Sequence, residues 1–401
     1  MIHKLLLLIT TGLPGLHKLL FFFLIESFFG IVVLGKFSND YYLIQLFIIF
    51  NAIGLGALLM INLPKMNIKE IEEYTSKVNA TLLIGLLFSL PFLYLLYIYD
   101  IIYSLFDSYL LLIGMSGNLL VRHYYLALKE YINLFLFDVF ILFFIIFVFY
   151  IDIQYSILSL ISYVYLISFG IFIFLKRINF VSTFIVFKDM KISLDITLVN
   201  LLSAGVYFLL IPMVNTKLGI EYAGLIGIIF TISSILVLVP RAISIYYLPD
   251  LSKNITNNEK VKVIYSRLKK ITIYSMIFLF ILSMILLYFL NNYLLAELFI
   301  LNNANILYIL FMSSVLISQL SMAPSNILVA LEKTDVLRNT GFLLVSGYII
   351  IYILFEIVNL KSYLFIYSFI MSMIFANLYR FLMLNKVVKE FINSKSKRKV
   401  I

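Results

Sequence analysis

The sequence predicts an all-α integral membrane protein with about twelve transmembrane helices, arranged as two six-helix lobes. Hydrophobic residues make up 63% of the 401 residues, and charged residues make up only 12%. Apolar runs of about 20 residues, the length that a helix needs to cross a bilayer, recur from end to end of the chain. A membrane β-barrel would show short alternating segments instead. Two similar segments in the two halves of the chain predict the lobes.

Polar breaks between the apolar runs set the expected order of the helices. Segments such as "GKFSND" (35–40) and "KMNIKEIEEYTSK" (65–77) carry charges that are costly in hydrocarbon and therefore mark the ends of spans. The longest break has roughly 20 residues, which is too few for a soluble domain. We expect helices over 5–34, 41–63, 80–99, 105–127, 131–151, 154–175, 194–216, 220–247, 271–290, 303–331, 336–356 and 362–385.

Basic residues predict the orientation of these helices. Loops on the side of the two termini hold 22 Lys and Arg residues, and the opposite loops hold only Lys36, Lys217 and Lys361. Because basic loops stay in the cytoplasm, both termini are predicted to be cytoplasmic. The basic loops 64–79 and 248–270 are expected to hold short amphipathic helices on the anionic leaflet.

An internal repeat predicts the two lobes. The segments "VLGKFSND…NLPKM" and "KLGIEYAG…YYLPDLS" each run from Leu-Gly to Leu-Pro, with 29 positions from Gly35 to Pro64 and 30 from Gly219 to Pro249. Helices 1 and 2 therefore match helices 7 and 8, and the two halves are related by a pseudo-two-fold axis along the membrane normal. The predicted domains are an N-lobe (1–175), a cytoplasmic linker (176–193), a C-lobe (194–385) and a basic cytoplasmic tail (386–401).

The motif "LGIEYAGL" (218–225), followed by a span that ends in "YYLPDLSK", resembles the signature of polysaccharide flippases. These proteins belong to the multidrug/oligosaccharidyl-lipid/polysaccharide exporter superfamily. In the first half, Tyr41 and Tyr42 stand where the glycine of the pattern would fall. The resemblance implies two six-helix lobes, alternating access and a location in the bacterial inner membrane. It also implies a substrate, an undecaprenyl-diphosphate-linked oligosaccharide such as an O-antigen repeat unit.

Such a substrate needs cationic side chains in a water-filled cavity, since they must hold its diphosphate. Lys18 lies 13 residues after the expected start of span 1 and is the deepest cation. If the helix instead begins near residue 19, Lys18 lies at the interface. The other candidates lie nearer the cytoplasmic ends of their spans, where they either bind substrate or only extend to the interface. The candidate substrate-binding residues are Lys18, Arg122, His123, Arg241 and Arg380.

Two carboxylates inside the spans are candidates for ion coupling. Glu26 lies eight residues after Lys18 on the same helix, and Asp138 lies in span 5. A carboxylate in such a site can carry a proton or bind sodium during transport. The alternative is a structural pair between Lys18 and a carboxylate of another helix. The coupling ion, membrane lipids and other polysaccharide-assembly proteins are therefore the expected partners, together with the oligosaccharide lipid.

Composition and motifs argue against several other functions. The chain has no Cys and only three His, which leaves few ligands for a metal. No phosphate-binding loop or nucleophile motif is present, so we expect no enzymatic activity and no cofactor. The net charge of +10 lies mainly beside the spans, so a nucleic-acid partner is not expected. Two alternatives stay open: a multidrug or other small-solute exporter of the same superfamily, and a membrane-embedded polysaccharide polymerase.

Overall fold

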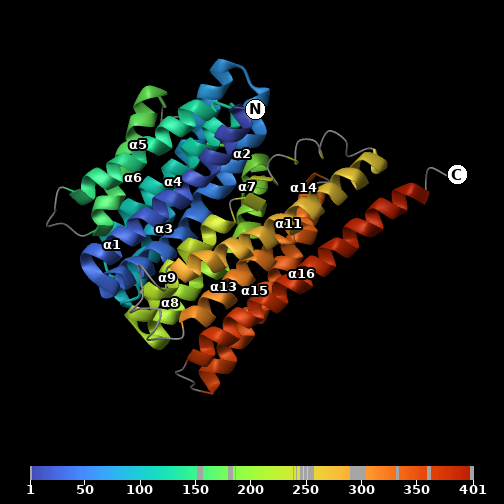
Figure 1. The fold of residues 1–401 in the computed structure, drawn as a ribbon. Helices are drawn as coiled ribbons and strands as arrows, with labels where there is room; N and C mark the ends of the chain where they lie inside the picture. Colours follow the sequence, from blue (N-terminus) through green and yellow to red (C-terminus); the bar gives the residue numbers. More distant parts are fainter. Residues whose placement is uncertain are drawn as a thin grey trace. The chain divides into compact units, whose positions relative to one another are not determined.

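The computed structural model consists of long helices (Figure 1). No strand occurs in the part of the chain that it describes. The described residues are 2–150, 157–178, 184–185, 187–237, 239–240, 242–243, 247, 251, 257–289, 304–330, 334–358 and 363–397.

A helix lies over each of the predicted spans, although several ends differ. In the first half the order is α1 (Ile2–Ile48), η1 (Ile49–Ile53), α2 (Gly54–Asn62), η2 (Leu63–Lys65), α3 (Ile68–Ile98), α4 (Leu105–Ala127), α5 (Tyr131–Tyr150) and α6 (Ile157–Leu175). The second half has α7 (Phe187–Asn200), η3 (Leu201–Gly205), α8 (Val206–Leu218), α9 (Ile220–Leu236), α11 (Asn258–Phe289), α13 (Ala304–Gln319), α14 (Met322–Ala330), α15 (Thr334–Ile357) and α16 (Tyr363–Lys397). Nine described helical segments are long and apolar enough to cross a membrane, so the chain is a multi-pass membrane protein.

The connection between the first two spans is a single glycine. Gly30 has φ 80° and ψ 173°, whereas the residues around it are helical. This left-handed region favours glycine because a Cβ atom would be strained there. The prediction of a loop at 35–40 was therefore wrong, since the second span starts directly after Gly30 and "GKFSND" lies within it.

A second glycine makes the same connection between spans 7 and 8. Gly219 has φ 97° and ψ 173°, with α8 ending at Leu218 and α9 beginning at Ile220. The two connections share the sequence Gly-Ile-x-x-x-Gly, as "GIVVLG" (30–35) and "GIEYAG" (219–224). The repeat was therefore aligned five residues out of register. Once it is corrected, Gly35 matches Gly224, and the first copy keeps both glycines.

The predicted short amphipathic helices were also wrong for the described residues. The segment 68–79 is the first part of α3, and 258–270 is the first part of α11. The start of α3 is fixed by a capping box, in which Asn67 accepts from the Glu70 backbone N–H and Glu70 accepts from that of Asn67. Both spans therefore continue past the expected membrane surface as single helices.

The chain divides into two compact units, residues 1–227 and 228–401. In the first unit, α4 packs against α6, α1 against α5 and α8, and α2 against α4 and α7. In the second unit, α13 and α15 pack against α16. The lobe boundaries expected at 175 and 194 stay a prediction.

Two π-helical turns interrupt the long helices of the first unit. They are η1 in the second span and η3 in the seventh, and they contact each other. Turns of this type widen a helix locally and occur often at functional sites. Within η1, the Asn51 side chain donates to the Ser89 hydroxyl at 2.8 Å, which ties the second span to the third.

Candidate functional site

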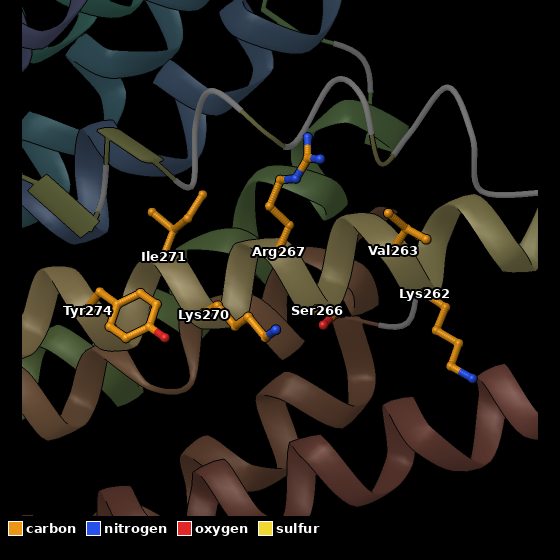
Figure 2. Close-up of a pocket in the computed structure, with 7 residues that line it drawn as sticks. All are labelled: Lys262, Val263, Ser266, Arg267, Lys270, Ile271 and Tyr274. Carbon is orange, nitrogen blue, oxygen red and sulfur yellow. The ribbon is translucent and has the colours of Figure 1, made fainter.

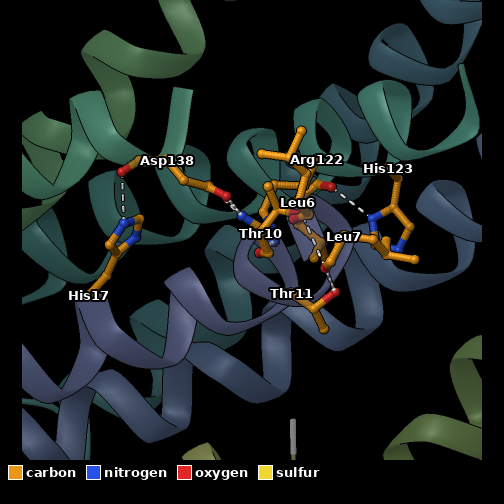
Figure 3. A network of polar contacts seen from close by, with 9 residues as sticks. Leu6, Leu7, Thr10, Thr11, His17, Arg122, His123 and Asp138 are labelled. Carbon is orange, nitrogen blue, oxygen red and sulfur yellow. Dashed lines mark hydrogen bonds and ion pairs between the residues drawn. The ribbon is translucent and has the colours of Figure 1, made fainter. Parts of the chain in front are cut away.

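A buried ion pair joins α4 to α5. The Arg122 guanidinium donates to both carboxylate oxygens of Asp138, and both side chains are buried (Figure 3). A second guanidinium nitrogen donates to the carbonyl oxygen of Thr10 on α1 at 2.6 Å. The guanidinium is thus held by two helices besides its own.

His17 provides a second link between α1 and the ion pair of Arg122 and Asp138. Its Nε2 donates to the backbone carbonyl oxygen of Asp138 at 2.8 Å. Three helices, α1, α4 and α5, therefore meet at one network. Breaking a buried ion pair by removing one partner leaves a charge without compensation, which typically costs about 3–5 kcal/mol. We conclude that the network helps to hold these three helices together.

The structure brings together two residues for which the sequence predicted separate tasks. Arg122 was a candidate for binding substrate, and Asp138 was a candidate for ion coupling. Their proximity could have been read from the sequence. Arg122 comes eight residues before Glu130 in the turn, and Asp138 comes eight residues after it. In an antiparallel helix pair, positions equally far from the turn lie side by side.

Lys18 lies in an aromatic environment. Its ammonium is 4.3 Å from the ring centroid of Tyr42, 5.5 Å from that of Tyr41 and 5.8 Å from that of Phe22. The side chain is buried, with 9% of its surface exposed. A desolvated cation above aromatic faces gains about 2 kcal/mol or more from each favourable contact. The first span and the start of the second therefore build a cation-holding aromatic cluster, which we define as Lys18, Phe22, Tyr41 and Tyr42.

His123 packs between its own helix and the second span. Its Nδ1 donates to the Leu119 carbonyl oxygen at 2.7 Å. The ring also lies on Gly56, where a Cβ atom would be 2.7 Å from Nδ1. The tyrosines that follow it, Tyr124 and Tyr125, are buried and contact the ring of Phe172. These two rings form part of the helix packing and do not present open faces to a sugar.

The remaining predicted residues are separate from this network. Glu26 is half-buried on α1 and forms no ion pair within the described part of the chain. Arg380 is half-buried on α16 in the second unit. Arg241 lies outside the described residues. Of the predicted set, Arg122 and Asp138 alone are joined to each other by a described hydrogen bond or ion pair.

A shallow cavity of about 540 Å³ lies along α11 in the second unit (Figure 2). Figure 2 shows its lining side chains in a row along this single helix. The cationic ones are Lys262, Arg267 and Lys270, and Tyr274 follows toward the apolar part of the helix. The groups of His, Asp and Glu that a metal would need are not found among the described residues.

Comparison with known proteins identifies the fold. No family model and no curated protein matches the sequence. Solved structures do match over nearly the full length. An inward-facing multidrug resistance MATE family transporter of the MOP superfamily has a TM-score of 0.68 and 14% identity, over 98% of this chain and 99% of that chain. The fold is that of a MATE transporter.

Two further structures with this fold widen the comparison. The MATE multidrug transporter DinF-BH in complex with the dye rhodamine 6G has a TM-score of 0.65 and 12% identity, over 96% of this chain and 94% of that chain. The eukaryotic MATE transporter AtDTX14 has a TM-score of 0.67 and 10% identity, over 99% and 96%. The predicted fold class, all-helical with two lobes, is therefore confirmed. At 10–14% identity these structures show the fold alone, and the flippase specificity stays a prediction.

Proposed function

We propose that this chain exports small organic solutes across a bacterial plasma membrane by alternating access, with both termini in the cytoplasm. One observation carries the proposal. The fold matches MATE multidrug transporters over nearly the whole of both chains, as in the 98% and 99% covered in one of them. This is the small-solute alternative that the sequence left open.

The chemistry of the buried cations also favours a small solute over a diphosphate. A diphosphate needs cations that can turn toward it in a wet cavity. The Arg122 guanidinium is engaged by Asp138 and by the Thr10 carbonyl oxygen, and the Lys18 ammonium lies among aromatic rings. Recruiting either cation would break contacts that already compensate its charge.

We infer that Asp138 takes part in ion coupling, with Arg122 as its resident counter-ion. A proton or sodium ion that binds the carboxylate would compete with the guanidinium for the same oxygens. Such competition would loosen the link between α4 and α5 and so connect ion binding to a change in helix packing. Glu26, half-buried on α1, is the second coupling candidate.

The lipid-linked oligosaccharide flippase remains the second candidate because of the "LGIEYAGL" motif. The corrected alignment of the repeat also supports this candidate, since both halves carry the Gly-Ile-x-x-x-Gly form of that motif. Lys18, Arg122, His123, Arg241 and Arg380 would then be the cations to test for contact with the diphosphate.

Two cell assays separate the candidates. In a strain without its main efflux pumps, expression of the chain should lower the accumulation of the rhodamine dye, and Asp138→Asn should restore it at equal protein level. In a strain without its own flippase, expression should leave surface polysaccharide absent. Restored polysaccharide with unchanged accumulation of the dye and of other small organic solutes would reject the exporter and support the flippase.

A further inference from the structure

Asn215, near the end of α8, bridges two other segments of the first unit. Its side-chain nitrogen donates to the Asn39 side-chain oxygen at 3.2 Å and to the Tyr103 hydroxyl at 3.2 Å. Asn39 belongs to the second span, and Tyr103 belongs to the connection between α3 and α4. The charge distribution of the loops places this end of the helices outside the cell.

The acceptors of these bonds are firmly held. The Asn39 side-chain nitrogen donates to the Ile101 carbonyl oxygen at 2.7 Å. The neighbouring carboxylate of Asp40 accepts from the backbone N–H groups of Tyr103, at 3.0 Å, and of Ser104, at 3.3 Å. The second span and the connection therefore form one corner, and the Asn215 side chain links α8 to it.

A close backbone contact lies next to this corner. A Cβ atom on Gly35 would be 2.1 Å from the Ile220 carbonyl oxygen, and one on Gly224 would be 2.9 Å from that of Ile31. In the corrected register of the repeat these contacts are the two halves of one symmetric pair. Deeper along the same helices, a Cβ atom on Gly227 would be 2.5 Å from the Ser38 hydroxyl.

We propose that Asn215 is the positioning residue of an extracytoplasmic gate. Its two hydrogen bonds hold α8 and the start of α9 against the second span, and their release lets these helices part. The proposal rests on the proposed transport function, because a gate of this kind is needed only for alternating access. Asn215 acts through the helices that it positions and does not contact the solute.

Two properties of the site suit a gate that opens. The two bonds of Asn215 join uncharged groups and lie partly in solvent. Each therefore shifts the equilibrium between the closed and the open gate by only about 5-fold. The connections next to the gate, Gly30 and Gly219, have nothing within 4 Å of an added Cβ atom. Both have positive φ, so each can act as a one-residue hinge.

Thiol labelling tests the proposal without any substrate. The chain has no Cys, so a single Ser38→Cys variant reports on one position only. Ser38 is fully buried and faces Gly227 behind the gate. A membrane-impermeant maleimide is added to the outside of cells or right-side-out vesicles, and the labelling rate then follows the population of the open gate.

Three variants are compared in this background. Asn215→Ala removes both bonds and should speed labelling by about 5- to 30-fold, while Tyr103→Phe removes one and should speed it by up to about 5-fold. Thr216→Ala is the matched control, since the described hydrogen bond of its hydroxyl stays within its own helix, at the Met213 carbonyl oxygen, and labelling should not change. A second reporter, Ser168→Cys, lies buried in α6 and should stay protected in every variant.

Unchanged labelling of Ser38→Cys in Asn215→Ala overturns the proposal, and so does equal acceleration by Thr216→Ala. If Asn215→Ala also exposes Ser168→Cys to labelling, this variant has lost its fold. The proposal is then tested by Tyr103→Phe alone, and unchanged labelling of Ser38→Cys in that variant overturns it. Because labelling needs no solute, a working gate in a chain that exports nothing would reject the proposed function alone. If the chain exports the solute but Asn215→Ala leaves the labelling rate of Ser38→Cys unchanged, the gate alone is rejected.

Discussion

Gly35 of the second span lies against Ile220 of α9 with no space for a side chain between them. A Cβ atom on Gly35 would be 2.1 Å from the Ile220 carbonyl oxygen. The reciprocal contact joins Gly224 and Ile31, where a Cβ atom on Gly224 would be 2.9 Å from the Ile31 carbonyl oxygen. Real Cβ atoms are essentially never closer than 3.0 Å to such an atom. The two copies of the repeat therefore meet through backbone atoms, at the place where each copy carries the second glycine of its motif.

This contact predicts that alanine will not be tolerated at Gly35. In Gly35→Ala the added methyl group must push α9 away, at a typical overpacking cost of about 1–3 kcal/mol. We expect a lower unfolding temperature of the purified protein and faster labelling of Ser38→Cys. Gly170→Ala is the matched control, because Gly170 lies within α6 and has nothing within 4 Å of an added Cβ atom. Equal behaviour of the two variants would contradict the reciprocal packing.

The ion pair between Arg122 and Asp138 predicts strong coupling in a double-mutant cycle. Arg122→Gln and Asp138→Asn each leave one buried charge without its partner, so each should lower the free energy of unfolding by about 3–5 kcal/mol. The double variant leaves no charge and should be destabilised by clearly less than the sum. Denaturation of the three variants in the same detergent gives the coupling energy. Additive losses would show that the two side chains do not stabilise each other.

The aromatic cluster predicts that the ring of Tyr42 matters more than its hydroxyl. Tyr42→Phe keeps the face beneath the Lys18 ammonium, whereas Tyr42→Leu removes an attraction of about 2 kcal/mol. We expect Tyr42→Leu to lose more stability than Tyr42→Phe, by thermal unfolding. The difference should shrink in a Lys18→Met background, where no cation remains. A difference that persists there would assign the effect to packing alone.

Lys18 itself is tested by transport. If it contacts the exported solute, Lys18→Ala should lower the initial rate of export of the rhodamine dye severalfold. Lys18→Arg should keep part of that rate, because it preserves the charge above the rings. Rates are compared in vesicles that contain equal amounts of folded protein. Full export by both variants would remove Lys18 from the candidate substrate contacts.

The basic row on α11 predicts binding of anionic phospholipid. Near a charged leaflet each Lys or Arg contributes about 1 kcal/mol, which corresponds to roughly 5-fold in affinity. Replacing Lys262, Arg267 and Lys270 by Gln should therefore reduce the anionic lipid retained on purification, as measured by native mass spectrometry. Lys386→Gln with Lys389→Gln on α16 is a control with two other exposed cations. Equal loss in both sets would show only a general charge effect.

Hydropathy was enough to predict the helical spans, because a bilayer requires long apolar runs with all backbone hydrogen bonds made internally. It could not place the first connection. A polar segment such as 35–40 looks like a loop when its partners are unknown, yet here Asn39 and Asp40 are buried against the connection at 101–104. Hydropathy does not depend on backbone dihedral angles, so it could not indicate the positive φ of Gly30. The repeat was therefore aligned on the wrong glycine.

The candidate site was predictable in part. Polar residues inside spans are costly enough to stand out, which is how Lys18, Arg122 and Asp138 were found. Their partners depend on tertiary packing, and the sequence alone does not show which rings surround Lys18. The pairing of Arg122 with Asp138 was accessible, because they flank one short turn symmetrically. Asn215 was missed because an amide near the end of a span looks like an ordinary loop residue.

Ion-driven export of a small organic solute can be measured in proteoliposomes. The purified chain is reconstituted, an inward or outward gradient of protons or sodium is imposed, and movement of the rhodamine dye is followed by fluorescence. We predict dye movement against its concentration gradient that stops when the ion gradient is collapsed and is lost in Asp138→Asn. Folded protein that moves neither this dye nor other amphipathic solutes under either gradient would contradict it.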